Sequence, residues 1–281
     1  MDIQSNLLDG LRVAITGGTS GLGLALVREL HQRGARTAFV ARTAERVNEV
    51  ALQHPGTIGI VGDIARKDDI YPIALQITGN LGGLDVLVNN ASSLGPVPLA
   101  LLADTDCEDL EAALAANVVG PFRLTKALAG ALAASARAGR GAAVINISSD
   151  AAVNAYPTWG AYGASKAALL HMSRIWDEEL APEGVRVLSF DPGDMDTPLH
   201  ALAVPDADPA ALKRPEAAAR ELALRLAAMT EEREARSGQA LRVAALTEER
   251  ALRSGQALRL AAMTEERAAR SGQAGVAEAI Q

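Results

Sequence analysis

The sequence predicts an α/β fold, a doubly wound parallel sheet of about seven strands with helices on both faces and a repetitive, mostly helical C-terminal tail. Three observations predict this fold. Short apolar runs alternate with longer segments whose apolar residues recur at helical spacing, helical crossovers separate the strands, and the first strand leads into a glycine-rich turn. The chain has 281 residues, of which 49% are hydrophobic, enough to bury the core of one large domain.

The elements can be assigned in order along the chain. Buried strands are predicted at residues 11–16, 35–41, 58–61, 84–89, 143–148 and 185–190. Helices are predicted over residues 21–34, from residue 43, over about 117–138 and over about 160–180. Because a parallel sheet binds ligands at the carboxyl ends of its strands, we expect the functional residues to follow the strands directly.

The tail has a different character. From Leu224 a 17-residue unit recurs three times, as LRLAAMTEEREARSGQA, LRVAALTEERALRSGQA and LRLAAMTEERAARSGQA. In one continuous helix the apolar stripe of each copy would be rotated by about 260° relative to that of the copy before it, which excludes a straight coiled coil. The Ser-Gly pair of each copy would also interrupt such a helix. We assign residues 1–243 to the folded domain. Residues 244–281 are interpreted as a duplicated or artificially extended tail rather than a binding module.

Composition excludes several classes of protein. The chain has 27 basic and 34 acidic residues, a formal charge of −7, so no basic surface for nucleic acid is expected. Cys107 is the one cysteine, which excludes an internal disulfide and suits a reducing compartment. The sequence shows no signal peptide, no apolar run of about 18 residues and too few histidines and cysteines for a zinc site. We expect a cytoplasmic protein with no nucleic-acid partner, no membrane partner and no metal.

The segment TGGTSGLG follows the first strand and opens a helix. Its glycines, Gly17, Gly21 and Gly23, allow a tight turn and a close approach of the backbone to a diphosphate. The helix N-terminus adds free N–H groups and the positive end of a dipole. An ordinary strand-to-helix turn is the alternative, but the position after a strand and before a helix is the one that a dinucleotide site requires.

Polar motifs follow the later strands. Asn89-Asn90-Ala91-Ser92 ends the fourth strand, and Ser148-Ser149 ends the fifth. Tyr162 and Lys166 lie four residues apart in YGASK, which places them on one helix face about one turn apart. Asp191-Pro192-Gly193 follows the sixth strand, with Thr197 shortly after.

In these five ordered motifs, over residues 6–216, the chain resembles the short-chain dehydrogenases/reductases. The resemblance implies a single-domain Rossmann-type fold that binds NAD(H) or NADP(H), oxidises alcohols or reduces carbonyls, and commonly forms dimers or tetramers. It implies a catalytic tetrad of Asn117, Ser149, Tyr162 and Lys166. It also implies cofactor contacts by Thr16, Gly17, Thr19, Ser20, Gly21, Leu22, Gly23, Asp63, Asn89, Ala91, Tyr162, Lys166, Pro192, Gly193 and Thr197. The family resemblance further implies a seventh strand at 237–243.

Physical chemistry supports these roles. A free tyrosine has a pKa near 10, and we expect the Lys166 ammonium to lower that of Tyr162, the general acid–base. Ser149 would hold the substrate oxygen by a hydrogen bond, and Lys166 would also bind the ribose hydroxyls. The resemblance assigns to Asn117 a water in a proton relay behind the lysine.

The second strand indicates which cofactor is preferred. NAD enzymes place an acidic residue at its end, on the ribose 2′-hydroxyl, but here that position is Ala41, followed by Arg42. A guanidinium can bind a 2′-phosphate bidentately, so we expect NADP(H) to be favoured over NAD(H). A solvated loop charge is the alternative for Arg42.

The substrate region is expected at residues 194–215, a segment typical of a lid, with Tyr156, Trp159, Met195 and Leu199 as candidate pocket residues. The nearby carboxylates, Asp150, Asp194 and Asp196, either disfavour anionic substrates or cap helices and stay solvated.

The sequence thus predicts an NADP(H)-dependent oxidoreductase acting on a carbonyl or secondary alcohol. A catalytically silent cofactor-binding regulator and an interaction protein that uses the repeated tail are the alternatives.

Overall fold

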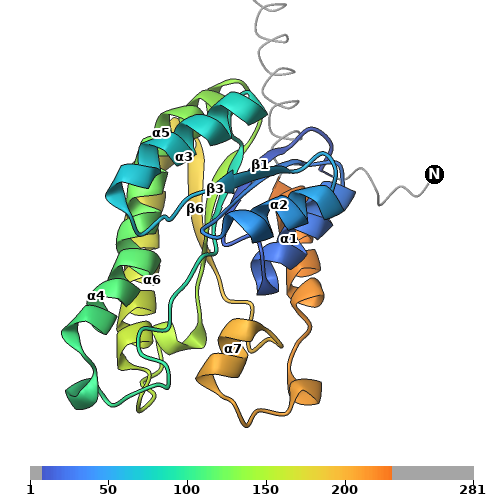
Figure 1. Cartoon of the computed structure of the whole chain (residues 1–281). Helices are drawn as coiled ribbons and strands as arrows, with labels where there is room; N and C mark the ends of the chain where they lie inside the picture. Colours follow the sequence, from blue (N-terminus) through green and yellow to red (C-terminus); the bar gives the residue numbers. More distant parts are fainter. Residues whose placement is uncertain (1–7, 230–281) are drawn as a thin grey trace, which may run out of the picture. The chain divides into compact units, whose positions relative to one another are not determined.

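A six-stranded parallel sheet is the centre of the computed structural model, which describes residues 8–229 (Figure 1). The strands are β1 Arg12–Thr16, β2 Arg36–Ala41, β3 Ile58–Val61, β4 Val86–Asn89, β5 Ala142–Ile147 and β6 Val185–Phe190. Their order is β3-β2-β1-β4-β5-β6, and every neighbouring pair is parallel. The order reverses between β1 and β4, which is where a doubly wound sheet opens a crevice for ligands.

The predicted α/β class and all six described strands are confirmed. β4 begins at Val86, two residues later than predicted, and β5 starts one residue earlier. The expected seventh strand at 237–243 and the repetitive tail lie outside the described residues.

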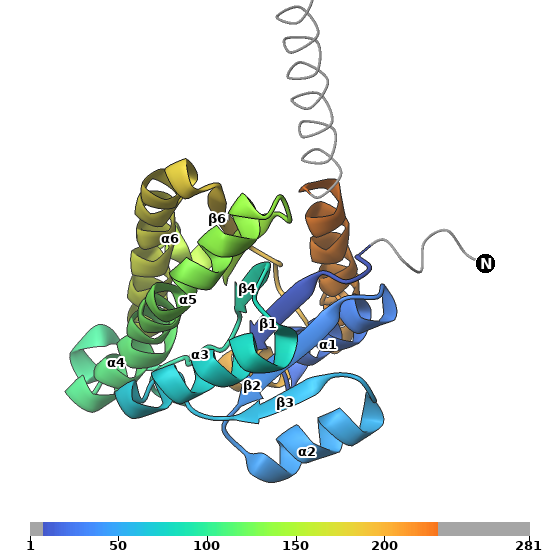
Figure 2. The same cartoon turned by 90° about the horizontal axis from the view of Figure 1, so that it is seen from above.

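Helices cover both faces of the sheet, as the view from above shows (Figure 2). One face carries α1 (Gly21–Gln32), α2 (Ala44–Gln53) and the helical residues 215–229, and the other carries α3 (Lys67–Leu81), α5 (Gly120–Arg137) and α6 (Gly160–Leu180). Two shorter helices, α4 (Cys107–Leu114) and α7 (Pro198–Ala203), lie in the connections. In α3, which the sequence analysis did not single out, Ile70, Ile73 and Ile77 repeat at helical spacing and are buried.

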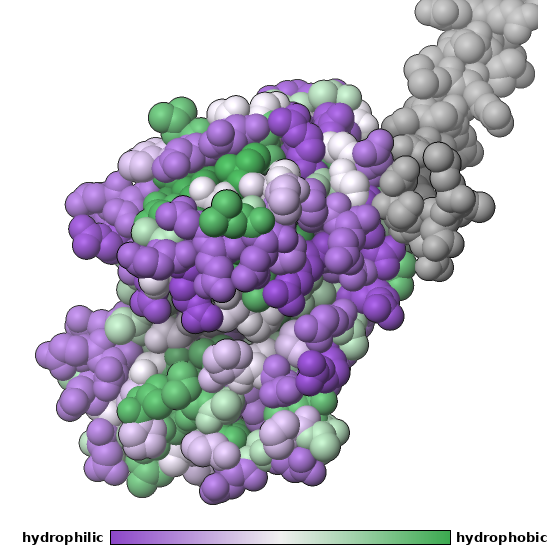
Figure 3. All heavy atoms as spheres, turned by 45° about the vertical axis from the view of Figure 1, so that its right-hand side comes forward, coloured by the Kyte–Doolittle hydropathy of each residue, from purple (hydrophilic) through white to green (hydrophobic). Residues whose placement is uncertain are grey.

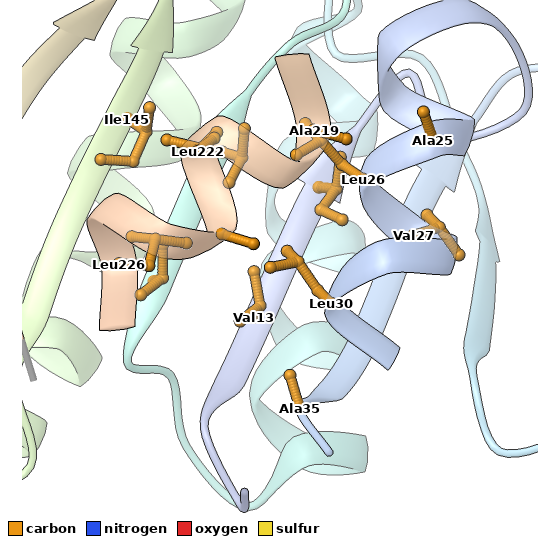
Figure 4. Close-up of a cluster of buried hydrophobic side chains, with 14 of the residues drawn as sticks. Val13, Ala25, Leu26, Val27, Leu30, Ala35, Ile145, Ala219, Leu222 and Leu226 are labelled. Atoms are coloured by element: carbon orange, nitrogen blue, oxygen red, sulfur yellow. The ribbon is translucent and has the colours of Figure 1, made fainter. Parts of the chain in front are cut away.

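Each face of the sheet has its own apolar cluster. Figure 4 shows Leu222 and Leu226 of the helical segment 215–229 between Ile145 of β5 and the α1 residues Leu26 and Leu30. The other face is filled mainly from α3 and α5. Because both faces are buried, the strands are continuous apolar runs, which is why they were recognisable in the sequence.

None of the helices within residues 8–229 is both long enough and apolar enough to cross a membrane.

Candidate active site

A cleft of about 1120 Å³ lies at the carboxyl ends of the strands. It extends from Arg42 and Thr43, after β2, past the start of α1 to Ser149, Tyr162 and the segment after β6. In Figure 1 this end of the sheet is the lower one, where α7 lies. The polar strand ends predicted from the sequence therefore meet in one cleft.

The glycine turn between β1 and α1 is built as a tight cradle. Gly17 and Gly21 have φ values of 72° and 50°, which favour glycine. A Cβ on Gly23 would lie 2.0 Å from the carbonyl oxygen of Gly17, so no other residue fits there. Ser20 caps α1 with extended backbone and makes no side-chain capping bond, which leaves the first N–H groups of the helix free.

Thr16 joins this turn to the end of β4. Its buried hydroxyl accepts hydrogen bonds from the backbone N–H groups of Asn90 and Ala91, both at 3.0 Å, and the Asn90 amide donates to the Thr16 carbonyl at 2.9 Å. Thr16 and Gly23 do not themselves line the cleft, whereas Gly17, Thr19, Ser20, Gly21, Leu22 and Ala91 do. Thr16 thus holds the glycine turn and the segment after β4 together without lining the cleft itself.

Tyr162 and Lys166 of α6 both line the cleft and are almost fully buried, with exposed fractions of 8% and 2%. The Lys166 Nζ donates to the Ile147 carbonyl at 2.8 Å, at the end of β5, and lies 5.5 Å from the centroid of the Tyr162 ring. The structure therefore brings the YGASK pair to the cleft with the tyrosine and the ammonium side by side.

The pKa of Tyr162 differs from the expectation. Burial is the largest cause and raises the pKa of Tyr162 to about 12. The charges of Asp191 and Asp150 also raise this pKa, whereas hydrogen bonding with Ser149 and Ser92 lowers it. Burial also lowers the pKa of Lys166 to about 8, opposed by Asp191. The expected lowering of the tyrosine pKa by Lys166 is not found in the chain alone: Lys166 is not among the groups that act on Tyr162, and burial raises its pKa.

Ser149 lies at the end of β5 and faces the same cleft. Its Oγ donates to Asp150 Oδ1 at 3.2 Å and accepts the Ala151 N–H at 3.2 Å. Ser92 is a site residue to which the sequence analysis gave no role, although it belongs to the motif quoted after the fourth strand. Ser92 donates to Asn117 Oδ1 at 3.1 Å and also lowers the pKa of Tyr162, so it interacts with two members of the expected tetrad.

Asn117 lies in a π-helical turn, Ala115–Val119, between α4 and α5. It is fully buried and does not line the cleft. Its Oδ1 accepts from Ser92 Oγ at 3.1 Å and Ser93 N at 2.8 Å, and its Nδ2 donates to Ser93 O at 2.7 Å and Ser165 Oγ at 2.8 Å. The side-chain amide of Asn117 thus makes all four of its hydrogen bonds within the protein, and these bonds link the loop after β4 to α6.

Asn89, expected among the cofactor contacts, is also buried behind the cleft rather than in its lining. Its Nδ2 donates to Asn146 Oδ1 at 2.8 Å across the β4–β5 pair, and Asn146 Nδ2 donates to Ser173 Oγ of α6 at 2.8 Å. This chain of bonds sets the position of α6, and therefore of Tyr162, against the sheet.

The segment after β6 forms the opposite wall. Pro192, Gly193 and Thr197 line the cleft, and a Cβ on Gly21 would lie 3.2 Å from the Thr197 methyl, so α1 and α7 begin close together. Backbone hydrogen bonds join the two ends of the expected substrate segment 194–215. Lys213 N donates to Asp194 O and Asp196 N donates to Lys213 O, both at 3.0 Å.

The four candidate pocket residues all line the cleft: Tyr156, Trp159, Met195 and Leu199. The Trp159 ring stands edge-on to Tyr162, with centroids 5.7 Å apart. Of the three carboxylates, Asp150 and Asp194 line the cleft, while Asp196 does not and pairs with Arg214 at 3.2 Å.

At the other end of the cleft, Arg42 is exposed and lines it, and within residues 8–229 it has no ion-pair partner. Asp63 also lines this end, and its Oδ1 accepts the Ala65 N–H at 2.9 Å. In the described part of the chain, no group of three or more His, Cys, Asp or Glu side chains is placed to hold a metal ion.

Comparison with known proteins identifies the family. The family model described as short chain dehydrogenase matches residues 12–208. The chain is 30% identical over 196 residues to the 3-oxoacyl-[acyl-carrier-protein] reductase of Thermotoga maritima, covering 68% of this chain and 77% of that one. It is 32% identical over 194 residues to the 2-(R)-hydroxypropyl-CoM dehydrogenase of Xanthobacter autotrophicus, covering 67% and 76%. The solved short chain dehydrogenase of Burkholderia cenocepacia in complex with NADP superposes with a TM-score of 0.67 at 28% identity, covering 78% of this chain and 91% of that chain.

Proposed function

The chain belongs to the short-chain dehydrogenase family of oxidoreductases, and from this premise we propose that it interconverts a carbonyl compound and its secondary alcohol with NADP(H). One observation carries the proposal: Tyr162, Lys166 and Ser149 line the same cleft as the uncapped N-terminus of α1. A proton-transfer group and a phosphate-binding turn are thus placed in one cavity.

The cleft fits a dinucleotide. The free N–H groups at the start of α1 and the close backbone approach at Gly17 and Gly21 suit a diphosphate. Its volume of about 1120 Å³ slightly exceeds the usual range for small-molecule sites, which leaves room for a substrate beside the cofactor. When bound, the nicotinamide would supply or accept the hydride.

Tyr162 is proposed as the general acid–base. With a pKa of about 12 in the chain alone, its hydroxyl keeps its proton at neutral pH, which suits donation to a carbonyl oxygen. Alcohol oxidation would need the phenolate, and the positive charge of an oxidised nicotinamide would favour that form. The protonated form of Tyr162 in the chain alone is therefore the form that carbonyl reduction requires.

The other members of the tetrad have separate roles. Ser149 would turn its proton from Asp150 to the substrate oxygen as negative charge develops there. Lys166 uses one N–H on Ile147 and has two more for the ribose hydroxyls. Since the Asn117 amide is fully used, we propose that it positions the Ser92 loop and α6, and that a relay water would be held by its backbone.

The preference for NADP(H) is supported by Arg42, a guanidinium that lines the cleft after β2 without an ion-pair partner among residues 8–229. Ala41, at the end of β2, provides no carboxylate to bind a 2′-hydroxyl or to repel a 2′-phosphate. The NADP complex of the Burkholderia relative adds support.

The test replaces Tyr162 with phenylalanine, which removes only the hydroxyl. We expect kcat for NADPH-dependent reduction of a panel of aldehydes and ketones to fall by about 10²–10⁴, because general acid catalysis is lost. NADPH affinity, measured by nucleotide fluorescence, should stay unchanged.

Tyr71→Phe, on an exposed residue of α3, is the matched control and should keep full activity. NADPH binding without turnover of any carbonyl by the unmodified chain would instead support the silent regulator. Absence of NADPH binding would refute the proposal.

A further inference from the structure

The end of the cleft around Tyr162 has a largely apolar wall, and we call it the substrate end. Leu94, Ala151 and Tyr162 form a buried cluster there, with Trp159 and Leu199 packed against it. In Figure 3 apolar surface, drawn in green, also appears on the lower part of the molecule, the level at which α7 lies in Figure 1. A bulky apolar or aromatic group beside the reacting carbon suits this wall.

Three carboxylates lie in the lining of the substrate end: Asp150, Asp191 and Asp194. Asp191 and Asp150 act on Tyr162 in the direction that raises its pKa, and Asp150 and Asp194 do the same at Tyr156. The negative charges of Asp191 and Asp150 therefore act on the Tyr162 hydroxyl, which would bind the substrate oxygen.

Of the two cations in the described lining, Lys166 interacts with Asp191, whereas neither Lys166 nor Arg42 is among the groups that act on Asp150. Lys166 is buried behind the Tyr162 ring and donates to Ile147 O. Arg42 follows β2, which β1 and β4 separate from β5. Three strand spacings of about 4.8 Å put about 14 Å between the ends of β2 and β5. That distance is longer than the screening length of about 8 Å at physiological ionic strength.

Asp150 has the most definite position of the three carboxylates. Its Oδ2 accepts the Tyr156 hydroxyl at 2.6 Å, and its Oδ1 accepts the Ser149 hydroxyl at 3.2 Å. The Tyr156 bond is also the main reason why the pKa of Asp150 is lowered, so this carboxylate is ionised at neutral pH. A fixed negative charge thus lies directly beside the serine that would bind the substrate oxygen.

We propose that Asp150 determines substrate charge: the site takes an uncharged carbonyl compound with a bulky apolar or aromatic substituent and rejects the corresponding anion. This inference rests on the proposed function. Like-charge repulsion at a short distance is an efficient means of excluding a wrong substrate.

The test compares two probes of the same shape, methyl para-acetylbenzoate and para-acetylbenzoate, with NADPH as reductant. We expect kcat/KM to be about tenfold or more higher for the ester, and the preference to shrink at high salt. Asp150→Asn should reduce the ratio about threefold or more, and Asp194→Asn should act in the same direction.

Two variants serve as controls. Tyr156→Phe removes the hydrogen bond but keeps the charge, so the preference for the ester should persist. Asp104→Asn removes an exposed charge outside the cleft lining and should leave the ratio unchanged.

A ratio near one in the unmodified chain, or a ratio that Asp150→Asn does not change, would overturn the inference while leaving the oxidoreductase proposal intact. Reduction of neither probe by a chain that binds NADPH and reduces other carbonyls would overturn the substrate class. Loss of NADPH binding itself would identify the failure as that of the proposed function.

Discussion

Tyr162 and Lys166 show how burial sets the protonation of the site. Desolvation moves both groups toward their neutral forms, raising the pKa of the phenol to about 12 and lowering that of the ammonium to about 8. At neutral pH the chain alone therefore holds a protonated tyrosine beside a lysine that is still mostly charged. These are the protonation states that a general acid and a ribose-binding ammonium require.

Arg42 allows a prediction at the same scale. Arg42→Asp should weaken NADPH binding by about 10–100-fold, because a bidentate partner of the 2′-phosphate becomes a repelling charge. NADH binding should improve or stay the same, since a carboxylate at this place can accept the ribose 2′-hydroxyl. Fluorescence titration of both nucleotides gives the ratio of dissociation constants.

Arg46→Asp is the control for this prediction. Arg46 is an exposed residue of the neighbouring helix α2, carries the same charge and does not line the cleft. An Arg42→Asp variant with an unchanged ratio would mean that Arg42 is only a solvated loop charge.

At the scale of secondary-structure elements, Asp85 forms ion pairs and hydrogen bonds that link several elements near the amino ends of β1 and β4. Its carboxylate is fully buried, pairs with Arg12 of β1 at 2.6 Å and Arg140 at 3.1 Å, and accepts the hydroxyl of Ser135 of α5. Burial is the largest influence and would raise its pKa, but these hydrogen bonds outweigh it and lower the pKa from 3.8 to about 2. The group lies away from the cleft, so its role is in stability.

Asp85→Asn should lower the free energy of unfolding by about 2–3 kcal/mol. Removing one partner of a buried pair costs about 3–5 kcal/mol, but here the two arginines are partly exposed. A depressed carboxyl pKa contributes stability above the unfolded value of about 4. That contribution is lost as the pH falls through about 4 to 2. Urea unfolding at neutral pH and near pH 3 measures both effects.

Glu183→Gln breaks the exposed pair between Glu183 and Arg137 and should cost less than about 1 kcal/mol. Equal losses in the two variants, or a difference that does not shrink at low pH, would contradict the role assigned to Asp85.

At the scale of the whole molecule, the helical segment 215–229 completes the core on one face of the sheet. Ala219, Leu222 and Leu226 are at most 3% exposed and pack on α1, β1 and β5 (Figure 4). The first copy of the 17-residue unit begins at Leu224, so its opening residues belong to this core helix. Leu226 and Ala227 are therefore needed by the domain as well as being part of the repeat.

Truncation after Ala244 should leave the melting temperature within about 2 °C of the full chain and keep NADPH affinity. The described residues of the apolar clusters on the two faces of the sheet all precede Ala244. A change of 1 kcal/mol would already move the melting temperature of a domain this size by about 2–4 °C. Truncation after Ala223, which removes Leu226, should unfold the chain at a much lower temperature. A large loss on removing residues 245–281 would show that the later copies are structural.

Much of the site was accessible from the sequence because its residues occupy strand ends. Gly17, Gly21, Ser149 and the Tyr162–Lys166 pair lie where a parallel sheet must present them. The role of Ser92 was not, because it depends on a contact with Asn117, 25 residues further along the chain. For Asp150 the sequence left two alternatives open, and its position beside Ser149 and Tyr156 depends on which way a loop side chain turns.

The sequence by itself determined the class of fold, the positions of six strands, the family and many of the residues that line the cleft. Those features are local: periodicity, glycine at a turn and fixed spacing within a motif. Tertiary structure alone decided that Asn89 and Asn117 lie behind the cleft, that residues 215–229 close the core, and that the Tyr162 pKa rises. The physical reason is that burial and hydrogen-bond partners come from elements far apart in the chain, and desolvation depends on all of them together.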